Sequence, residues 1–221
     1  YAKKIGVDVF SVYHYWSNGK LLMEKPIENL LKSKNHEFKF YLNWANHSFF
    51  NKVDGLNKKL LWKQKYCQNF IDSHVTYLNH AMQDYRYHRI HGMPVFNIYD
   101  PRNIPNFRSF VTEYKERFLK KYKTEIHLRL TLKDYKDIDL IKNNIDLIDS
   151  VYEYQPFFIN HSNILNYYSY EFLLRLRRDF MKKVSIFNAE KTVNRIVKSK
   201  KCIRDIPYGI GAYTGWDTTP R

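Results

Sequence analysis

The stretch FKFYLNWANHSFFNKVDG, residues 38–55, joins a strand-like run to an unusual loop. Its first half is an apolar and aromatic run with the length and composition of a buried β-strand. Its second half changes abruptly to Asn46, His47, two phenylalanines and the turn-forming pair Asp54 and Gly55. A simple turn needs only that last pair. The amide, imidazole and aromatic side chains before it therefore indicate a loop with a binding role.

Further runs along the chain share the strand signature of this stretch. Aromatic and β-branched residues dominate each of them, and with the first they occupy residues 7–15, 38–45, 93–100, 125–132, 149–156 and 210–216. Amphipathic helical patterns lie between them, at residues 60–82, 106–122, 138–148 and 172–181. Strands that alternate with helices predict a parallel sheet covered by helices, and therefore an α/β fold.

Length and composition bound the class of protein. The 221 residues, 44% of them hydrophobic and 17% aromatic, are enough to bury the core of one domain. No apolar run approaches the roughly 18 residues of a membrane helix. Cys67 and Cys202 are far apart and show no CxxC spacing. We therefore expect a reducing, cytoplasmic compartment and no disulfide framework.

The formal net charge of +15 suits three classes of partner, namely nucleic acid, an anionic membrane surface and an acidic or phosphorylated substrate. The lysines are scattered through amphipathic segments, and the dense basic run is short, at residues 198–201. The sequence contains no RNA-binding or zinc-finger signature. We therefore expect no nucleic-acid partner, and a basic solvated surface accounts for most of the charge.

Polar and aromatic side chains follow the predicted strands at their carboxyl ends, where function gathers in parallel sheets. Such side chains suit a sugar, because aromatic faces stack on its C–H face while amides and carboxylates bond its hydroxyls. The candidate sugar-binding residues are His14, Trp16, Trp44, Asn46, His47, Asp54, Tyr99, Arg102 and Trp216. The candidate carboxylates for proton transfer are Asp217 and Glu153.

Each candidate taken alone also has a structural explanation. Trp16 and Trp44 are typical of core packing. His14 is typical of a buried structural histidine, and Asp54 of a turn. Their shared position after successive strands favours binding, since unrelated packing choices would not all gather at one end. The histidines within residues 85–92 lack the further ligands of a metal site, so we expect neither a metal nor a cofactor.

Four motifs follow one another along the chain: YHYWSNGK (13–20), LNWANHSFFNKVDG (42–55), MPVFNIYDPRNIP (93–105) and GWDTTPR (215–221). Together they resemble the WbsX-like family, which occurs in gene clusters for O-antigen and other surface polysaccharides and is related to glycoside hydrolase family 99. The resemblance implies a (β/α)8 TIM-type barrel that acts at the anomeric carbon of a glycan. It implies either a glycosyltransferase or a retaining glycoside hydrolase.

The chain also departs from the family pattern. The family usually has a glutamate at the position of His47, so an imidazole replaces an acidic contact. The family's paired glutamates lie C-terminal to GWDTTPR, so the main acid/base pair is expected beyond Arg221. Six strands instead of eight, and a start without Met, predict an incomplete barrel. We therefore expect residues 1–221 to be a single barrel domain truncated at both ends.

Three hypotheses for the function result, of which the third, a nucleic-acid-binding protein, rests on the net charge alone. In the first, the full-length protein is an enzyme that acts on an oligosaccharide or lipid-linked glycan of the bacterial surface. It is cytoplasmic and peripheral to the inner membrane, where the positive charge contacts anionic headgroups. The sugar, the linkage, the direction of reaction and the oligomeric state stay open. In the second hypothesis, a non-catalytic protein uses the same side chains only to bind a glycan.

Overall fold

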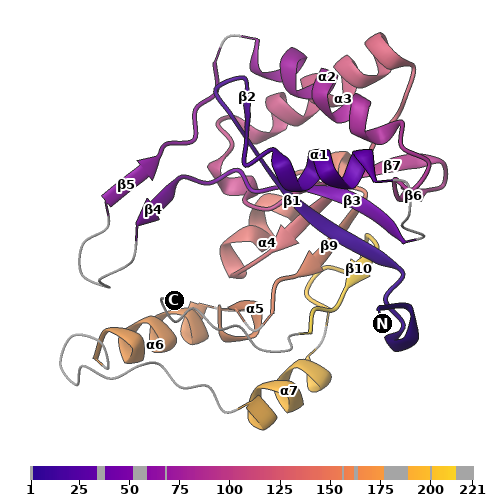
Figure 1. Ribbon diagram of the computed structural model, residues 1–221. Coiled ribbons are helices and arrows are strands. Elements are labelled where there is room, and N and C mark those ends of the chain that lie inside the picture. The colour runs from indigo at the N-terminus through magenta and orange to yellow at the C-terminus, as the bar shows by residue number, and fades with distance from the viewer. Residues whose placement is uncertain are drawn as a thin grey trace. The chain divides into compact units, whose positions relative to one another are not determined.

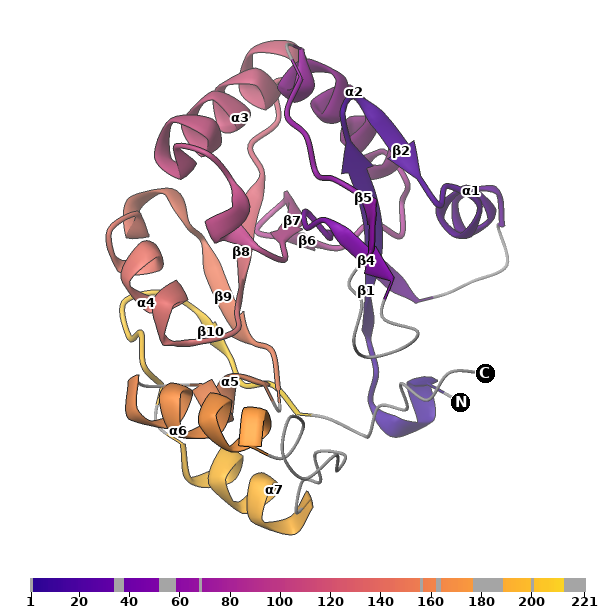
Figure 2. The same ribbon diagram turned by 90° about the vertical axis from the view of Figure 1, so that its left-hand side faces the viewer.

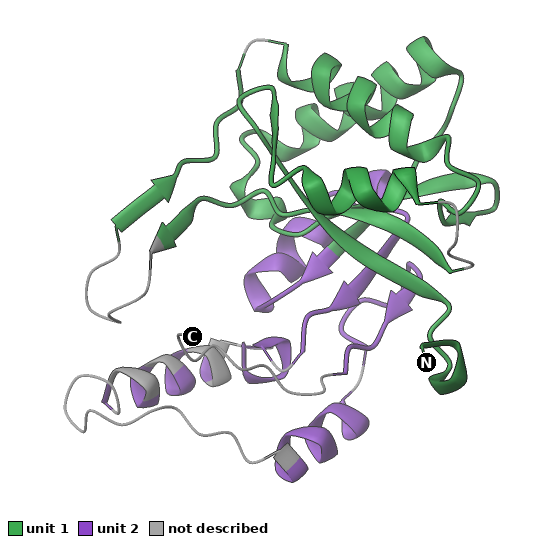
Figure 3. Ribbon diagram, in the orientation of Figure 1, with its two compact units in different colours: residues 1–130 green, residues 131–221 purple. Residues whose placement is uncertain are grey.

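The structure is a computed structural model. It describes residues 2–33, 38–51, 59–67, 69–155, 157–161, 164–176, 189–199 and 201–212. The chain divides into two compact units, Tyr1–Leu130 and Thr131–Arg221 (Figure 3). Helices and largely parallel strands make it a mixed α/β protein, which confirms the α/β part of the predicted fold class. Closure into a barrel, and a single domain over residues 1–221, stay predictions.

Strands and helices alternate along the first unit (Figure 1). In chain order they are η1 (Ala2–Ile5), β1 (Val9–Ser17), β2 (Lys20–Leu22), α1 (Lys25–Lys32), β3 (Lys39–Trp44), β4 (Phe49–Asn51), β5 (Lys59–Trp62), α2 (Phe70–Met82), β6 (Arg89–Ile90), β7 (Met93–Ile98), η2 (Pro101–Asn103), α3 (Phe107–Tyr122) and β8 (His127–Leu132). The last two residues of β8 belong to the second unit.

A parallel sheet organises the first unit. β1 pairs with β3, β3 with β7 and β7 with β8, all in parallel, while β2 and β6 pair antiparallel with β1 and β7. The register sets four residues side by side across the parallel strands, namely Tyr13, Asn43, Asn97 and Arg129. The next row along the strands is His14, Trp44, Ile98 and Leu130. Because neighbouring side chains of a strand point to opposite faces, the two rows lie on opposite faces of the sheet.

The helices α2 and α3 lie side by side (Figure 1 and Figure 2), and their aromatic side chains cover the face that carries Trp44. Trp44 is fully buried against Phe70 of α2 and Phe110 of α3. Phe96 of β7 stacks on Tyr114 of α3 at 5.6 Å between ring centroids. The apolar stripe predicted for residues 106–122 is thus confirmed as the face that α3 buries. This aromatic layer is the core of the first unit.

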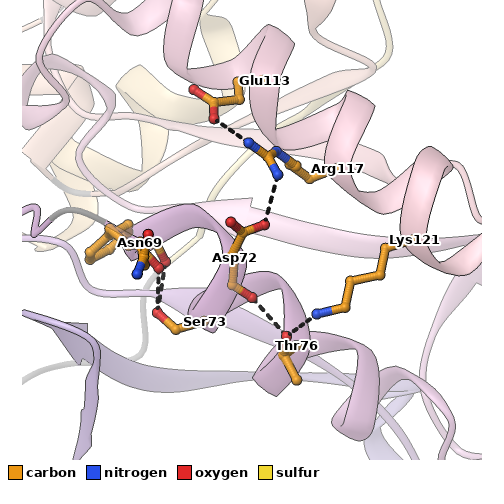
Figure 4. A network of polar contacts seen from close by, with 8 residues as sticks. Asn69, Asp72, Ser73, Thr76, Glu113, Arg117 and Lys121 are labelled. Atoms are coloured by element: carbon orange, nitrogen blue, oxygen red, sulfur yellow. Dashed lines mark hydrogen bonds and ion pairs between the residues drawn. The ribbon is translucent and has the colours of Figure 1, made fainter.

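Polar contacts join α2 and α3 outside this aromatic layer (Figure 4). Arg117 of α3 lies 3.2 Å from Asp72 of α2 and 3.4 Å from Glu113. Lys121 donates a 2.8 Å hydrogen bond to the hydroxyl of Thr76. The ion-pair side chains are about half-exposed, so each pair contributes less than about 1 kcal/mol. The helices are therefore held mainly by the buried rings.

The second unit, after the end of β8, contains α4 (Tyr135–Lys142), η3 (Ile145–Leu147), β9 (Ser150–Glu153), α5 (Phe157–His161), α6 (Ile164–Arg175), α7 (Ala189–Lys198) and β10 (Tyr208–Gly209). β10 pairs in parallel with β9. A capping box begins α4, in which Asp134 accepts from a backbone N–H and Asp137 accepts from the backbone N–H of Asp134. No helix in the described part of the chain has the length and apolarity needed to cross a membrane.

The structure confirms five predicted strands as β1, β3, β7, β8 and β9 and changes other elements. The helix predicted at 138–148 is α4, which ends at Lys142 and is followed by η3, and the helix predicted at 172–181 overlaps only the end of α6, with residues 177–181 outside the described residues. The strand predicted at 210–216 is displaced. Residues 208–209 form β10, residues 210–212 form no strand, and residues 213–216 lie outside the described residues. The helix predicted at 60–82 begins only at Phe70, because Lys59–Trp62 pairs with Phe49–Asn51 as β5. The apolar residues of this segment also fit helical spacing, so the sequence predicts a helix where the structure has a β-hairpin.

Candidate functional site

An aromatic cluster lies at the carboxyl ends of β1, β3 and β7. Tyr99, directly after β7, makes an edge-to-face contact with Tyr13 of β1 at 5.6 Å, and its ring lies 5.6 Å from that of His47. Phe49 of β4 lies 4.9 Å from His47 and 5.2 Å from Tyr15. These five residues are called the aromatic rim below. All of them are partly or largely exposed to solvent, so their rings are accessible to a ligand.

The same face of the sheet carries a polar row, defined as Asn43, Asn97 and Arg129. Asn97 donates a 2.6 Å hydrogen bond from Nδ2 to Oδ1 of Asn43, and both side chains are almost fully buried. The guanidinium of Arg129 lies 5.3 Å from the centre of the Tyr41 ring. Parallel strands are ordinarily apolar on both faces. Amides and a guanidinium in this row therefore favour a ligand with hydroxyl or anionic groups.

Asn46 joins the loops that follow β3 and β7. Its Nδ2 donates to the carbonyl oxygen of Asp100 at 2.7 Å, and its Oδ1 accepts from the Asp100 N–H at 2.8 Å. Its side chain is fully buried. Nearby, burial raises the pKa of Tyr66 to about 12, so its phenol stays protonated and donates to the carbonyl of Asn103. The Asn46 bonds fix the loop of His47 beside the loop of Tyr99.

His14, Trp16 and Trp44 are not part of this exposed rim. The Nε2 atoms of His14 and His74 lie 2.8 Å apart. The ring of Trp16 stacks on His74 at 5.0 Å, and Trp44 meets His74 edge-on at 4.9 Å. None of the three predicted residues is more than 7% exposed. Stacking on a sugar requires an accessible ring face, which these buried side chains do not offer. They instead pack between the sheet and the helices and support the strand ends.

Burial keeps the two histidines of this layer neutral. It lowers the pKa of His14 to about 3, and the backbone of Asn43 offsets part of this effect. Burial, and in second place the neighbouring His14, lowers the pKa of His74 well below its usual value. Since both rings are uncharged near neutral pH, one Nε2–H donates to the other Nε2. The pair is a neutral hydrogen bond inside an aromatic core.

The remaining candidates, apart from Glu153, occupy other places. Arg102 is exposed on η2, two residues after Asp100. Asp54, Trp216 and Asp217 lie outside the described residues. In residues 85–92, Arg86 donates to Asp84 and to the carbonyls of the α1 end, as a structural residue does. Within the residues that the structure describes, no group of three or more His, Cys, Asp or Glu side chains fits a metal ion.

Glu153, at the end of β9, lies in a polar cluster of the second unit and is 2% exposed. Tyr208 donates to its Oε1 at 2.7 Å, and Gln155 donates from Nε2 to its Oε2 at 2.7 Å. The Sγ atom of Cys202 lies 3.1 Å from the Tyr208 hydroxyl. Both carboxylate oxygens thus accept a hydrogen bond, which fixes the orientation of the carboxylate.

Two features hold the Glu153 cluster together. Burial, with the bonds to Cys202 and Glu153, raises the pKa of Tyr208, so its hydroxyl stays a donor. At Gly211, a Cβ atom would overlap the carbonyl oxygen of Glu153 and the Gln155 side chain. The chain after β10 therefore passes the end of β9 at a distance that only glycine permits.

Tyr13, Tyr15, Asn43 and Asn97 are absent from the candidates that the sequence provided. The first two alternate with His14 and Trp16 along one strand. That period-two alternation shows that the two sets lie on opposite faces. Which face the helices cover depends on tertiary packing, so the alternation alone does not identify the exposed set.

Comparisons with known proteins complete the description of the site. A family model described as "Glycosyltransferase WbsX" matches residues 1–221. Two similar proteins, both named "Uncharacterized protein WxcX", come from Xanthomonas campestris pv. campestris strains B100 and ATCC 33913. Each is 27% identical over 104 residues, which is 47% of this chain and 15% of the relative. The chain thus matches a small part of these relatives' length. No solved structure gives a significant match.

Proposed function

The chain belongs to the WbsX glycosyltransferase family, and from this premise we propose that its first unit binds a sugar of a polysaccharide or lipid-linked oligosaccharide. The family assignment by itself indicates a carbohydrate-active protein of polysaccharide biosynthesis with a glycan substrate. The proposed binding surface is the sheet face that carries the aromatic rim and the polar row. The predicted (β/α)8 barrel, of which this parallel sheet would be part, belongs to the same proposal.

The observation that carries the proposal is the position of the polar row next to the aromatic rim. Tyr13 and Tyr99 meet edge to face, and Asn43, opposite Tyr13 in the register, bonds Asn97. Rings at this spacing stack on the C–H face of a sugar. The partly exposed guanidinium of Arg129 pairs with an anionic substituent or a phosphate, while Asn43 and Asn97, buried and bonded to each other, give this face its polar character. His14, Trp16 and Trp44 support this face from the other side of the sheet.

The reaction that we propose is glycosyl transfer. A bond forms between an acceptor hydroxyl oxygen and the anomeric carbon of the donor sugar, and the bond from that carbon to the leaving group breaks. The acceptor hydroxyl proton passes to a carboxylate. Glu153 and Asp217 are the carboxylates of this chain proposed for that role. With water as the acceptor, the same steps would constitute hydrolysis.

Sugar binding tests the proposal directly. Isothermal titration calorimetry with α-mannosides, rhamnosides and purified surface polysaccharides would compare the parent with Tyr13→Ala and Tyr99→Ala. The control is Tyr85→Ala, which removes a tyrosine that is 78% exposed elsewhere on the same unit. We expect each rim variant to lose about tenfold in affinity, and the control to bind as the parent does. Equal affinities for rim variants and control would contradict the site.

Activity separates the enzyme from a binding protein. The full-length protein would be incubated with the sugar that binds and with nucleotide-linked or lipid-linked donors, and the products weighed by mass spectrometry. Extended products that disappear in Glu153→Gln would support transfer. Shortened products would support hydrolysis. Binding without any product would favour the non-catalytic alternative.

A further inference from the structure

The hairpin of β4 and β5 is a separate two-stranded sheet that projects from the main sheet of the first unit (Figure 1). Its register places Phe49 opposite Trp62 and Phe50 opposite Leu60. Phe49 belongs to the aromatic rim, whereas the next residue, Phe50, is 45% exposed. Leu60 and Leu61 are 46% and 61% exposed. The hairpin therefore exposes three large apolar side chains to solvent.

Polar bonds at its base and the ring contacts of Phe49 join the hairpin to the unit. The Gln64 N–H donates to Oγ of Ser48 at 3.0 Å, and Nε2 of Gln64 donates to the Trp16 carbonyl at 3.1 Å. The Lys65 N–H donates to Oγ of Ser17 at 3.0 Å. An isolated two-stranded sheet is only marginally stable in water, and an exposed apolar patch on such an element indicates an interaction surface.

The charge of the same segment bears on the class of partner. The side chains of Lys59, Lys63 and Lys65 are exposed beside the apolar residues. The described residues of this segment, 49–51 and 59–65, contain these three lysines and no acidic residue. A partner that accepts both large apolar groups and several lysines is the headgroup region of an anionic lipid bilayer.

We propose that the β4–β5 hairpin docks the first unit on an anionic membrane surface. Phe50, Leu60 and Leu61 enter the boundary between headgroups and acyl chains, and the three exposed lysines pair with lipid phosphates. The hairpin adjoins the aromatic rim through Phe49, so docking brings the rim to the bilayer surface. A glycan attached to a membrane lipid is presented there. This last consequence rests on the proposed function, whereas the membrane contact itself does not.

Co-sedimentation with lipid vesicles tests the docking. The vesicles are phosphatidylcholine alone, or phosphatidylcholine mixed with phosphatidylglycerol. The apolar variant is Phe50→Ser, Leu60→Ser and Leu61→Ser, and its matched control is Ile5→Ser, Met23→Ser and Leu119→Ser, also exposed on this unit. The charge variant is Lys59→Gln, Lys63→Gln and Lys65→Gln, and its matched control is Lys4→Gln, Lys25→Gln and Lys120→Gln. Circular dichroism checks that each variant is folded.

We expect the parent to bind the anionic vesicles and to bind the neutral ones much more weakly. The apolar variant should lose about tenfold in affinity or more, and the charge variant about a hundredfold. Each control should stay within about twofold to threefold of the parent, because its residues lie away from the hairpin. Losses in the controls equal to those in the hairpin variants would overturn the proposal. So would a parent that ignores vesicles but forms dimers through the hairpin in analytical ultracentrifugation.

The proposals of membrane docking and of sugar binding can be disproved independently of each other. The vesicles contain no glycan, and the sugars are tested without lipid. Tyr99→Ala should keep its vesicle binding, and the apolar hairpin variant should keep its affinity for a soluble sugar. A hairpin variant that loses the sugar but keeps the vesicles would place the hairpin in the sugar site instead and would contradict docking.

Discussion

His14 of β1 and His74 of α2 form a 2.8 Å hydrogen bond between their Nε2 atoms inside the aromatic core of the first unit. Trp16 lies flat on His74, with an angle of 4° between the two rings, and Trp44 meets it edge-on. A charge on either ring would be buried in this apolar layer, where burial disfavours the charged form. The bond therefore depends on both histidines being neutral.

This neutrality predicts a dependence of stability on pH. The folded-state pKa is lowered to about 3 for His14 and well below the usual value for His74, whereas the unfolded chain protonates them near pH 6.5. The unfolded state thus binds more protons below pH 6.5. The free energy of unfolding should fall by up to about 1.4 kcal/mol per pH unit for each histidine as the pH decreases towards 3.

Urea unfolding at several pH values measures this effect. The double variant His14→Asn and His74→Gln should show a shallower loss of stability between pH 6.5 and 4, because neither replacement titrates. His80→Gln, at an exposed position of the same helix, serves as the control and should keep the slope of the parent. A double variant with the parent's slope would show that the pair does not govern acid stability.

Asn46→Asp should destabilise the first unit. The substitution turns the Nδ2 donor, 2.7 Å from the Asp100 carbonyl, into a carboxylate oxygen that repels it in a fully buried position. We expect a loss of about 3 kcal/mol or more in the free energy of unfolding. Asn29→Asp, on the exposed part of α1, should change it by less than about 0.5 kcal/mol. Similar losses for the two variants would argue against the Asn46 bonds as a structural link.

Arg86→Lys should also be costly. Arg86 is 4% exposed, forms a two-point contact with Asp84 and donates to the carbonyls of Leu30 and Ser33 at the end of α1. Lysine lacks the planar fork for these contacts, so we expect a loss of about 2 to 4 kcal/mol. Arg117→Lys, in the half-exposed contact with Asp72, should cost less than about 1 kcal/mol. Denaturant unfolding compares the two, and equal costs would contradict this account.

Gly211→Ala tests the close passage over the end of β9. The new Cβ atom would overlap the Glu153 carbonyl oxygen, so the chain must move and the Tyr208 bond to Glu153 with it. We expect a loss of about 1 to 3 kcal/mol, measured as a lower melting temperature. Ile210→Ala, at an exposed neighbouring position, is the control and should have little effect. An unchanged melting temperature for Gly211→Ala would rule out the close approach.

The sequence predicts the parallel strands well because their apolar runs are buried, and it predicts α3 because a single apolar stripe repeats over its length. It fails at β5, since Leu60, Leu61 and Trp62 fit a helical pattern as readily as a hairpin. For the candidate site, the chemistry at the strand ends is readable but the choice of face is not. Trp44 looks like a platform for a sugar in the sequence, yet α2 and α3 cover it completely.

The most direct test of the central claim is a sugar titration followed by NMR. The side-chain amide signals of Asn43 and Asn97 report on the polar face of the sheet, and the indole N–H signals of Trp16 and Trp44 report on the helix-covered face. The account predicts that a bound sugar shifts the two asparagine signals and leaves the two indole signals in place. Shifts confined to the indole signals, or a bound sugar that moves neither set, would contradict it.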